Sequence, residues 1–508
     1  MLENTYCGYF HLIEALKLPV IEPRVRAEAS KAVNSKFLKG DRLLLPMRMA
    51  PGKDDVLGHV LLALKHEGTN LAVLAEVLPR LPKDLMQQEV NKHMVPEPLR
   101  KAAMLWELFT REELTIDRTF KNPVPLFDPQ RYVVGSSKRN RKWGIDCNGI
   151  GDLGWCPTIE RTPKIEAYLK KDILSDAARW VEEADALMLG RVVEWAYLSE
   201  TQGTYALESE SVSADKSQRF VKLLHRAGDA KALDESYLCD LQNDIVSSVY
   251  SQAFSFRTDQ NWLSSAHSRS ALSVTYVPPS PDVLDDLMKS FLNVVNGWQN
   301  DLDPIAAAAA ASFGFVYLHP FMDGNGRLSR FLIHRILERS GKLKRGLLLP
   351  ISAAMKECEA QYLEALTDFS KSAREFWSVV HTGGSPRFEF KFKGSVNMYR
   401  YWDATKQAEF VFEMADRALQ VHLREEADFL KLFDEVYRKA DSRFDVRQSD
   451  LQFLVGTVLD MKGTFSKNLR KKFRDRIESE VLDFIELAAR EALERREGDQ
   501  DDADDAEI

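Results

Sequence analysis

Residues 319–330 read HPFMDGNGRLSR and place a histidine, an acid, two glycines around an asparagine, and two arginines in twelve positions. They follow the apolar run ASFGFVYL at 311–318, which has the character of a buried helix end. A stretch of hydrophobic core rarely contains so many polar groups. DGNG lies directly before a predicted helix, where backbone N–H groups converge and the helix dipole favours an anion. The stretch therefore predicts a phosphate-binding turn between two helices.

The side chains of this stretch suit phosphate chemistry. Arg327 and Arg330 lie three residues apart on the first turn of the predicted helix, so both project toward the same space. Two guanidinium groups there can bind phosphate oxygens in forked pairs. Asp323 is a hard oxygen ligand suited to Mg²⁺, and His319 can act as a general base toward an incoming hydroxyl. This set predicts attack on a nucleotide phosphate.

Each feature alone has an ordinary structural explanation. A lone histidine after an apolar helix usually caps that helix, a lone GNG is usually a turn, and two arginines at this spacing usually lie on a solvated face. The functional interpretation rests on their occurrence together within twelve residues.

The stretch resembles the signature of the Fic (Fido) family, His-Pro-Phe-x-[Asp/Glu]-Gly-Asn-Gly-Arg-x-x-Arg, at every defined position. The resemblance covers roughly residues 190–375 and implies transfer of AMP from ATP to a Ser, Thr or Tyr hydroxyl of a protein target. It implies that His319 is the catalytic base and that Asp323 holds the Mg²⁺ cofactor. The residues that it assigns to nucleotide phosphates are Gly324, Asn325, Gly326, Arg327 and Arg330. Because the family's phosphotransfer branch usually has lysine at the position of Gly326, the match favours nucleotidyl transfer.

A second motif lies upstream, in SETQGTYALESESVSADKSQRF at 199–220. It resembles the inhibitory helix of self-regulated Fic proteins, whose pattern is [Ser/Thr]-x-x-x-Glu-[Gly/Asn]. Thr204 and Glu208 match this pattern, whereas Ser209 departs from it. The resemblance implies that Glu208 pairs with Arg330 and takes the place of the γ-phosphate. The alternative is that Glu208 is one of several acids on a solvated helix, since Glu210 lies close by.

Two weaker resemblances concern the target and the nucleotide base. FRTDQNWLSSAHSRSALSVTYVPPSP at 256–281 resembles the segment leading into the family's flap, a β-hairpin that aligns an extended segment of the target by strand addition, with residues 272–277 as its edge. AQYLEAL at 360–366 resembles the helix that supplies a tyrosine to the nucleotide pocket, which makes Tyr362 a candidate neighbour of the adenine. An isolated helical tyrosine is also a common core residue.

Hydrophobic periodicity predicts an all-α protein with minor β structure, and the resemblance implies a Fic-type helical core with a small β-hairpin flap. Residues 1–120 are predicted to form a helical N-terminal domain and 121–163 a loop-rich connecting segment. The Fic domain is expected at 164–380, with the inhibitory helix near 199–215 and the flap near 270–280. A linker or small strand is expected at 385–398 within a mainly helical C-terminal domain at 385–490, and the acidic residues 491–508 are expected to be a disordered tail.

Composition excludes several other classes of protein. The formal net charge of -8 argues against a general nucleic-acid binder, which usually carries a basic surface. The five cysteines form no CxxC pairs and suit reduced thiols. No apolar run approaches the ~20 residues that a membrane span needs, and the N-terminus lacks a signal-peptide pattern. A cytoplasmic protein is therefore expected, and a homo-oligomer is compatible with the sequence.

Two alternatives to an autoinhibited adenylyltransferase stay open at this point. The same fold could use another nucleotide or remove AMP from a modified protein. The chain could also be a nucleotide-binding regulatory module without transfer activity, although binding alone needs no base such as His319.

Overall fold

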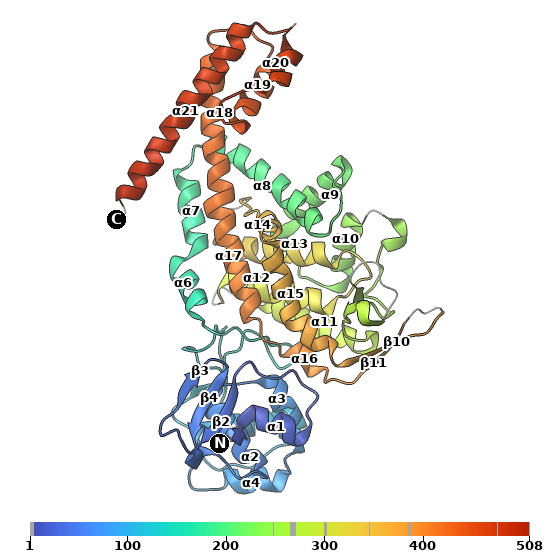
Figure 1. The fold of residues 1–508 in the computed structure, drawn as a ribbon. Coiled ribbons are helices and arrows are strands. Elements are labelled where there is room, and N and C mark those ends of the chain that lie inside the picture. Colours follow the sequence, from blue (N-terminus) through green and yellow to red (C-terminus); the bar gives the residue numbers. More distant parts are fainter. Residues whose placement is uncertain are drawn as a thin grey trace.

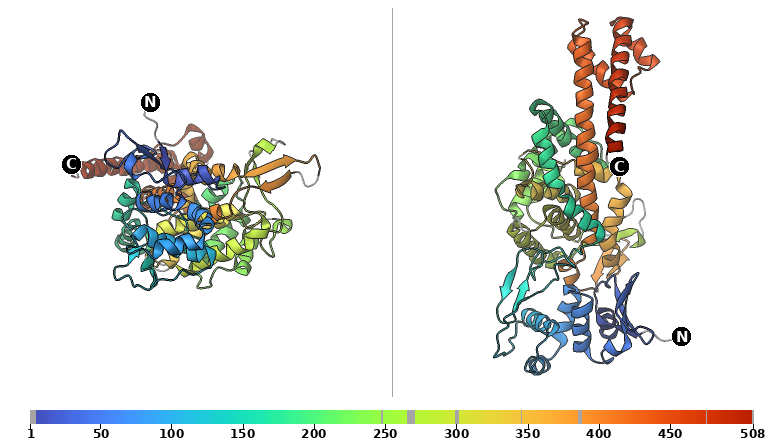
Figure 2. Two further views of the ribbon diagram at one scale, coloured as in Figure 1. Left: turned by 90° about the horizontal axis from the view of Figure 1, so that it is seen from below. Right: turned by 90° about the vertical axis from the view of Figure 1, so that its left-hand side faces the viewer.

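The structure is a computed structural model with three parts stacked along one axis (Figure 1). The N-terminal part lies at one end, a large helical body in the middle, and a protruding group of C-terminal helices at the other end; the elongated shape is also evident in Figure 2. The described residues are 5–246, 248–264, 271–298, 302–344, 346–384, 388–474 and 476–506, with side chains through residue 496.

The N-terminal part combines five helices with a four-stranded sheet. The sheet has the order β1-β2-β4-β3, in which β2 and β4 are parallel and the other pairs antiparallel. Its strands are β1 (Thr5–Cys7), β2 (Arg26–Ser30), β3 (Phe37–Lys39) and β4 (Arg42–Pro46). The helices are α1 (Gly8–Leu16), α2 (Val56–His66), α3 (Leu71–Val77), α4 (Lys83–Val90) and α5 (Glu97–Thr110).

The prediction of a helical domain over residues 1–120 missed the four-stranded sheet, whose strands lie on both sides of α1 in the first 46 residues. Strands of three to five residues are too short to reveal a two-residue period, and a short apolar run such as that of β4 cannot be distinguished from a helix segment by periodicity.

The segment 121–163 is loop-rich, as expected, and it also contains a short antiparallel hairpin. It forms a three-stranded sheet, ordered β5-β7-β6, from β5 (Val124–Pro125), β6 (Lys138–Asn140) and β7 (Ile145–Cys147). Trp143 and Ile145 are completely buried against the N-terminal helices. The segment therefore packs as part of the N-terminal core in addition to connecting it to the helical body.

The helical body is organised around α12 (Pro304–Leu318), in which only one residue is not buried. Asp303 caps this helix by accepting hydrogen bonds from the N–H groups of Ile305 and Ala306, and Pro304 occupies the first turn. The alanine run gives α12 a narrow surface on which neighbouring helices pack closely. These neighbours include α13 (Asn325–Arg339) and α17 (Thr405–Arg417).

The remaining helices of the body surround this pair. They are α6 (Pro163–Lys171), α7 (Ile173–Glu183), α8 (Ala186–Leu207), α9 (Ala214–His225), α10 (Glu235–Ile245), α11 (Pro281–Gly297), α14 (Ile351–Glu357), α15 (Glu359–Arg374) and α16 (Asn397–Arg400). The predicted all-α class with small β elements is thereby confirmed for the chain as a whole.

Two small hairpins lie on one side of the body. The flap expected near 270–280 contains β9 (Val274–Tyr276), which pairs with β8 (Leu263–Ser264) just before the expected range; residue 270 falls outside the described residues. The strand expected near 385–398 is β11 (Phe388–Phe392), which pairs with the unpredicted β10 (Trp377–His381). Trp262 packs edge-on against Phe388 at 5.5 Å between ring centroids, so the second hairpin supports the first.

The C-terminal part is helical, as its pattern predicted. A π-helical turn at Ala418–Leu423 joins α17 to α18 (Arg424–Asp441), which packs against α19 (Gln448–Asp460) and α21 (Ser479–Ala506); α20 (Lys467–Phe473) completes the group. The expected disordered tail from 491 is wrong for the backbone, since α21 continues to Ala506. A helix already packed over its first turns extends at low cost per residue, and no proline interrupts it.

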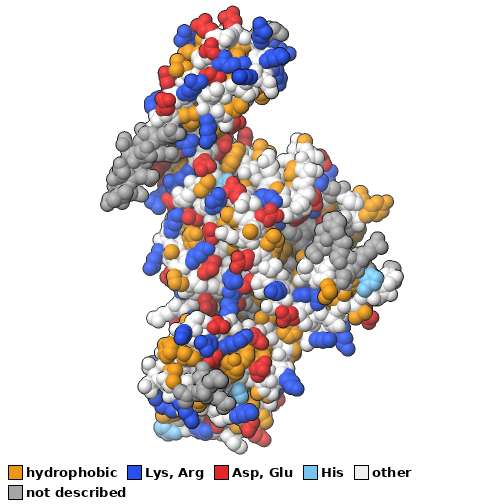
Figure 3. All heavy atoms as spheres, in the orientation of Figure 1, with side chains coloured by type: hydrophobic (Ala, Val, Ile, Leu, Met, Phe, Trp, Pro, Cys, Tyr) orange, Lys and Arg blue, Asp and Glu red, His pale blue; other side chains and the backbone are white. Residues whose placement is uncertain are grey.

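The distribution of charge on the surface and the character of the helices bear on two further expectations from the sequence. On the face in Figure 3, basic and acidic side chains are interspersed over the middle of the molecule and form no continuous basic stripe. Within the described residues, no helix combines the length and the apolar character needed to cross a membrane.

Candidate active site

His319 is the C-cap residue of α12 and has a left-handed backbone with φ of 51°. Its side chain is buried, and Nδ1 lies 3.1 Å from the carbonyl oxygen of Val316. Because a carbonyl only accepts hydrogen bonds, Nδ1 carries the proton and Nε2 keeps its lone pair. Arg257 donates from Nε to the His319 carbonyl at 2.8 Å and fixes the backbone on the other side.

Burial, with a smaller contribution from the positive charge of Arg257, lowers the pKa of His319 to about 4, against the opposing effect of the hydrogen bond to Val316. The imidazole is therefore neutral at physiological pH. A neutral imidazole with a free Nε2 can accept a proton from a hydroxyl group.

The turn after His319 is held from within by Asn325. Its Oδ1 accepts from the Phe321 N–H at 3.0 Å, and its Nδ2 donates to the Phe321 carbonyl at 2.7 Å. The Asn325 side chain thus closes the loop, whereas the sequence assigned it to the phosphate cradle directly. Gly324, at φ of 86°, turns the chain into α13 and leaves the N-terminal N–H groups of that helix available to an anion.

Arg327 and Arg330 extend from the first two turns of α13 and are nearly completely buried. Arg327 donates from Nη1 to the Ile245 carbonyl at 3.1 Å, and its Nη2 lies 3.3 Å from Oδ1 of Asp323. Arg330 donates from Nη2 to the Thr204 carbonyl at 3.0 Å and from Nε to the Thr204 hydroxyl. Both guanidinium groups are therefore preorganised by protein contacts.

Glu208 joins the two arginines. Its Oε1 lies 2.6 Å from Arg330 Nη2, and its Oε2 lies 2.9 Å from Arg327 Nε. The structure thus brings together the predicted pair of Glu208 and Arg330 and adds Arg327 to it. A Cβ atom placed on Gly326 would come within 2.5 Å of Glu208 Oε1, so the carboxylate rests against the glycine backbone in front of α13. The carboxylate occupies the position that helix and arginines offer to an anion.

The helix that delivers Glu208 is fixed by two further contacts on the same face. Glu200, Thr204 and Glu208 lie four residues apart on α8 and therefore share one side of it. Thr204 contacts Arg330, and the completely buried Glu200 accepts at Oε1 from His334 Nε2 at 2.7 Å and at Oε2 from the Ser352 N–H at 2.6 Å. Along α8, this face thus contacts Arg330 and His334 of α13 at successive turns.

Replacing Glu200 with alanine is expected to lower the free energy of unfolding by about 3–5 kcal/mol. The change leaves His334 and the N–H and hydroxyl groups of Ser352 buried without their partner. Urea unfolding followed by circular dichroism measures the loss. Glu194→Ala, at an exposed position of the same helix, is the matched control and should change the midpoint little. Equal midpoints for the two variants would contradict the role of Glu200 in seating α8.

Ser209 follows Glu208 and has a left-handed backbone, with φ of 57°. The inhibitory pattern has glycine or asparagine here, the residues that adopt this conformation most readily. Serine therefore stands in place of glycine or asparagine here, while the backbone keeps the left-handed conformation that those residues favour. The Ser209 N–H still donates to the Ala206 carbonyl at 3.0 Å, which ends the helix in a tight turn.

Ser209→Gly is expected to raise the free energy of unfolding by about 1 kcal/mol. Glycine relieves the strain of the left-handed backbone, and the greater entropy of glycine in the unfolded chain offsets part of this gain. The thermal midpoint should rise, and Ser209→Asn should shift it in the same direction. Ser211→Gly, two residues along the same connection, is the control. A lower midpoint for Ser209→Gly would show that the serine side chain makes a contact that outweighs the strain.

Tyr362 and Asp323 lie at opposite sides of the arginine pair. The Tyr362 hydroxyl is 3.5 Å from Arg330 Nη1, and its ring packs between Phe313 and Phe410 on the body side. Asp323 is at the solvent side, with a half-exposed side chain. The structure thus puts Tyr362 within reach of the arginine, and its predicted contact with adenine stays a prediction.

Sequence reasoning missed three residues that position the site. Arg257 holds the His319 carbonyl and also donates to the Pro279 carbonyl beyond the flap. Gln242 donates to the Asp323 carbonyl at 3.2 Å. Glu200 was quoted within the inhibitory segment without a role. None of the three belongs to a short motif, because the partners that link them to the site (His319, Asp323, His334 and Ser352) lie 62 to 152 residues away along the chain. Only a buried charge in an otherwise apolar pattern could have marked Arg257.

Residues 232–337 match the model of the Fic/DOC family. A relative named "Protein adenylyltransferase Fic" from Drosophila grimshawi is 46% identical over 67 residues, covering 13% of this chain and 14% of the relative. One of the same name from Nematostella vectensis is 42% identical over 71 residues, covering 13% and 16%. The chain therefore matches less than a fifth of the length of these relatives.

Solved structures resemble larger parts of the chain at low sequence identity. A Fic family protein from Desulfovibrio desulfuricans G20 aligns with 63% of this chain and 89% of its own, at 16% identity and a TM-score of 0.40. A Fic domain containing signaling protein from Bacteroides thetaiotaomicron VPI-5482 aligns with 51% and 96%, at 17% identity and a TM-score of 0.37.

Proposed function

We propose that this protein is an autoinhibited protein adenylyltransferase, which transfers AMP from ATP to a Ser, Thr or Tyr hydroxyl of a target protein or of itself. One observation carries the proposal: a neutral His319 with a free Nε2 stands beside a helix N-terminus whose two arginines are occupied by Glu208. The name of the relatives that share the matched segment agrees with this reaction.

In the proposed reaction, His319 Nε2 takes the proton of the target hydroxyl while its oxygen attacks the α-phosphorus of ATP. The bond between that phosphorus and the bridging oxygen breaks, and diphosphate leaves with AMP bound to the target. The N–H groups of α13, together with Arg327 and Arg330, would hold the phosphate oxygens in line for this attack.

The residues present fit a magnesium–nucleotide complex. Asp323 is a half-exposed carboxylate beside the cradle, and Mg²⁺ in such sites needs only one or two carboxylates besides phosphate oxygens and waters. Such a site needs no cluster of three or more His, Cys, Asp or Glu ligands, and the described residues contain none. When bound, the ion would neutralise charge on the phosphates.

Glu208 supplies the inhibition in this proposal. Its carboxylate forms ion pairs with both arginines and brings negative charge to the place of the γ-phosphate, so that ATP must displace it to bind productively. Target segments would dock along the flap strands β8 and β9.

All five cysteines lie in the described residues and are free thiols, which suits the reducing cytoplasm.

The proposal is tested by the position of a label in ATP. Purified Glu208→Gly protein is incubated with α-labelled or γ-labelled ATP and Mg²⁺, and the protein is separated from nucleotide. Label from the α-position in protein supports AMP transfer. Label from the γ-position alone would establish phosphoryl transfer, preference for another α-labelled nucleotide would change the donor, and loss of AMP from a pre-modified target would establish the reverse activity.

The pH profile should report the buried base. Because the pKa of His319 is lowered to about 4, the base is neutral above that pH and is lost only as the pH falls through about 4. At saturating MgATP, transfer by the Glu208→Gly variant is expected to keep most of its rate from pH 8 down to about pH 5, where an ordinary histidine would already be mainly protonated. A half-maximal rate near pH 6.5 would contradict the assigned environment.

A further inference from the structure

Three large apolar side chains project into solvent from the segment that follows α10. Tyr250 is completely exposed, and Phe254 and Val249 are 92% and 76% exposed. Single exposed apolar side chains are common on protein surfaces, but several close together are typical of a surface that contacts another molecule. Met322, inside the active-site turn itself, is also 55% exposed. These four side chains are called the apolar rim below.

The segment that carries the rim is fixed beside the active-site turn. Gln242 of α10 donates from one nitrogen, Nε2, to the Ser251 carbonyl at 2.7 Å and to the Asp323 carbonyl at 3.2 Å. The Ala253 N–H is held by Gln242 Oε1 at 3.0 Å and by Asn243 Oδ1 at 2.9 Å. Because a single amide nitrogen contacts both carbonyls, the segment lies directly next to Asp323. Exposed apolar side chains on a fixed backbone are preorganised for binding, since little entropy is lost on contact.

The same segment continues along the turn toward the flap. The Arg257 N–H donates to the Pro320 carbonyl at 2.8 Å, and Asn261 donates from Nδ2 to the Phe321 carbonyl at 3.3 Å. The segment therefore follows the turn that begins at His319 over most of its length. A target segment that places its hydroxyl at His319 comes within reach of the apolar rim as well as of the flap.

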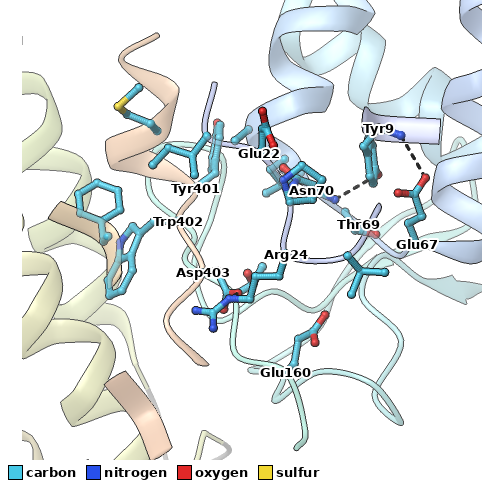
Figure 4. A pocket seen from close by; sticks show the side chains of 18 of the residues that line it. Tyr9, Glu22, Arg24, Glu67, Thr69, Asn70, Glu160, Tyr401, Trp402 and Asp403 are labelled. Atoms are coloured by element: carbon cyan, nitrogen blue, oxygen red, sulfur yellow. Dashed lines mark hydrogen bonds and ion pairs between the residues drawn. The ribbon is translucent and has the colours of Figure 1, made fainter. Parts of the chain in front are cut away.

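The flap is fixed in place as well. Arg374, at the end of α15, donates to the Val274 carbonyl of β9 at 2.9 Å. On the same helix, Asp368 lies 2.7 Å from Arg24 of the N-terminal part. Figure 4 shows Arg24 reaching toward Asp403, its second partner, at 2.6 Å. The N-terminal part thus stabilises the position of the helix that holds the flap.

An acidic depression of about 330 Å³ adjoins the segment beyond Phe254. Residues 255–258 line it together with the exposed side chains of Glu235, Asp282 and Asp285. Within the described part of the chain, none of these three acids forms an ion pair. Arg257 is buried in its wall and donates to three backbone carbonyls instead. The depression therefore presents a negative potential to a bound partner.

We propose that the apolar rim and the acidic depression select the target, whose modified segment carries a large apolar side chain near the hydroxyl and a lysine or arginine beyond it. The apolar side chain packs on Tyr250 and Phe254, which supplies affinity. The basic side chain pairs with Asp282 or Asp285, which sets the direction of the segment. The target is the expected occupant because the rim is continuous with the active-site turn. This inference rests on the proposed function and names the kind of target that the same site modifies.

Peptide libraries test the preference directly. Peptides with a central Ser, Thr or Tyr and randomised flanking residues are incubated with the Glu208→Gly protein, Mg²⁺ and α-labelled ATP, and the modified peptides are sequenced by mass spectrometry. We expect enrichment of large apolar residues at flanking positions and of lysine or arginine farther out. The basic preference alone should weaken at high salt, because salt screens exposed charges. Modified peptides without an apolar preference would overturn the proposal.

Tyr250→Ser and Phe254→Ser, each in the Glu208→Gly background, test the rim. Each is expected to lower kcat/KM for a peptide with flanking Phe and Arg about tenfold, mainly through KM, as for loss of a buried aromatic contact. Met94→Ser is the matched control, because Met94 is 76% exposed and lies in the N-terminal part. Equal thermal midpoints show that the variants are folded. Unchanged kcat/KM in both rim variants would contradict the proposal.

Neutralising the depression tests the charged half of the proposal. Asp282→Asn combined with Asp285→Asn is expected to abolish the preference for lysine and arginine while the apolar preference stays. Asp117→Asn, at an exposed position of the N-terminal part, is the control. A basic preference that survives the double change would show that the depression does not receive the basic side chain.

Binding measured without transfer distinguishes this inference from the proposed function. The probe is a dye-labelled peptide with Phe and Arg around a central Tyr, and its counterpart has Ser and Glu at those positions. Fluorescence anisotropy with the full chain reports docking whether or not AMP is transferred. Docking of the first peptide that is lost in the rim variants, without labelled product, would support the surface and exclude adenylyl transfer. Labelled product that forms equally from both peptides would support transfer and overturn the surface.

Discussion

Glu208→Gly is expected to raise the rate of AMP transfer by the purified protein about a hundredfold. The wild-type carboxylate pairs with Arg330 at 2.6 Å and with Arg327 at 2.9 Å, and ATP must break both contacts to present its γ-phosphate. Charge-assisted contacts of this kind contribute about 1.5–3 kcal/mol each, and the lower part of that range for two contacts corresponds to this factor. Initial rates with α-labelled ATP measure the change.

Two variants separate the charge of Glu208 from its shape and its surroundings. Glu208→Gln keeps the volume and removes the charge, so its rate should fall between those of wild type and Glu208→Gly. Glu210→Gln is the neighbouring control, because Glu210 lies 3.6 Å from Arg327 and makes no contact with Arg330. Activation by Glu210→Gln equal to that by Glu208→Gly would contradict the specific role of Glu208.

His319→Ala in the Glu208→Gly background is expected to lower transfer by about 10²–10⁴-fold, the usual contribution of a general base. Affinity for ATP should change little, since the phosphate contacts come from α13 and its arginines. Equilibrium binding of a fluorescent ATP analogue provides that second measurement.

His381→Ala is the matched control for this loss, because His381 is an exposed histidine on β10. It should keep the rate of the Glu208→Gly parent. A double variant without His319 that still transfers AMP at the parent rate would exclude proton abstraction by this residue, whatever its affinity for ATP.

The site could be predicted from the sequence because its chemistry is contiguous. One apolar helix, one tight turn and one helix start contain His319, Asp323 and both arginines, so local rules of turns and helix ends are sufficient. Glu208 was found by a pattern, and its second partner Arg327 was not, since pairing across about 120 residues depends on how α8 packs on α13.

Most of the missed features depend on tertiary contacts. The N-terminal sheet consists of strands of three to five residues, whose period is too short to read. One missed feature is local: the side-chain amide of Asn325 pairs with the backbone of Phe321, four residues away, whereas the resemblance assigned Asn325 to the phosphate cradle. The buried Glu200 interacts with His334 and Ser352, which lie more than 130 residues away and become neighbours only through the packing of α8, α13 and α14.

The most direct test of the account is mass spectrometry of cell-lysate proteins after incubation with ATP and purified wild type, Glu208→Gly, or Glu208→Gly with His319→Ala. The account predicts AMP-modified Ser, Thr or Tyr peptides with Glu208→Gly, few with wild type, and none above background with the double variant. Equal modification by wild type and Glu208→Gly, or modification that persists without His319, would contradict an enzyme that uses His319 and is inhibited by Glu208.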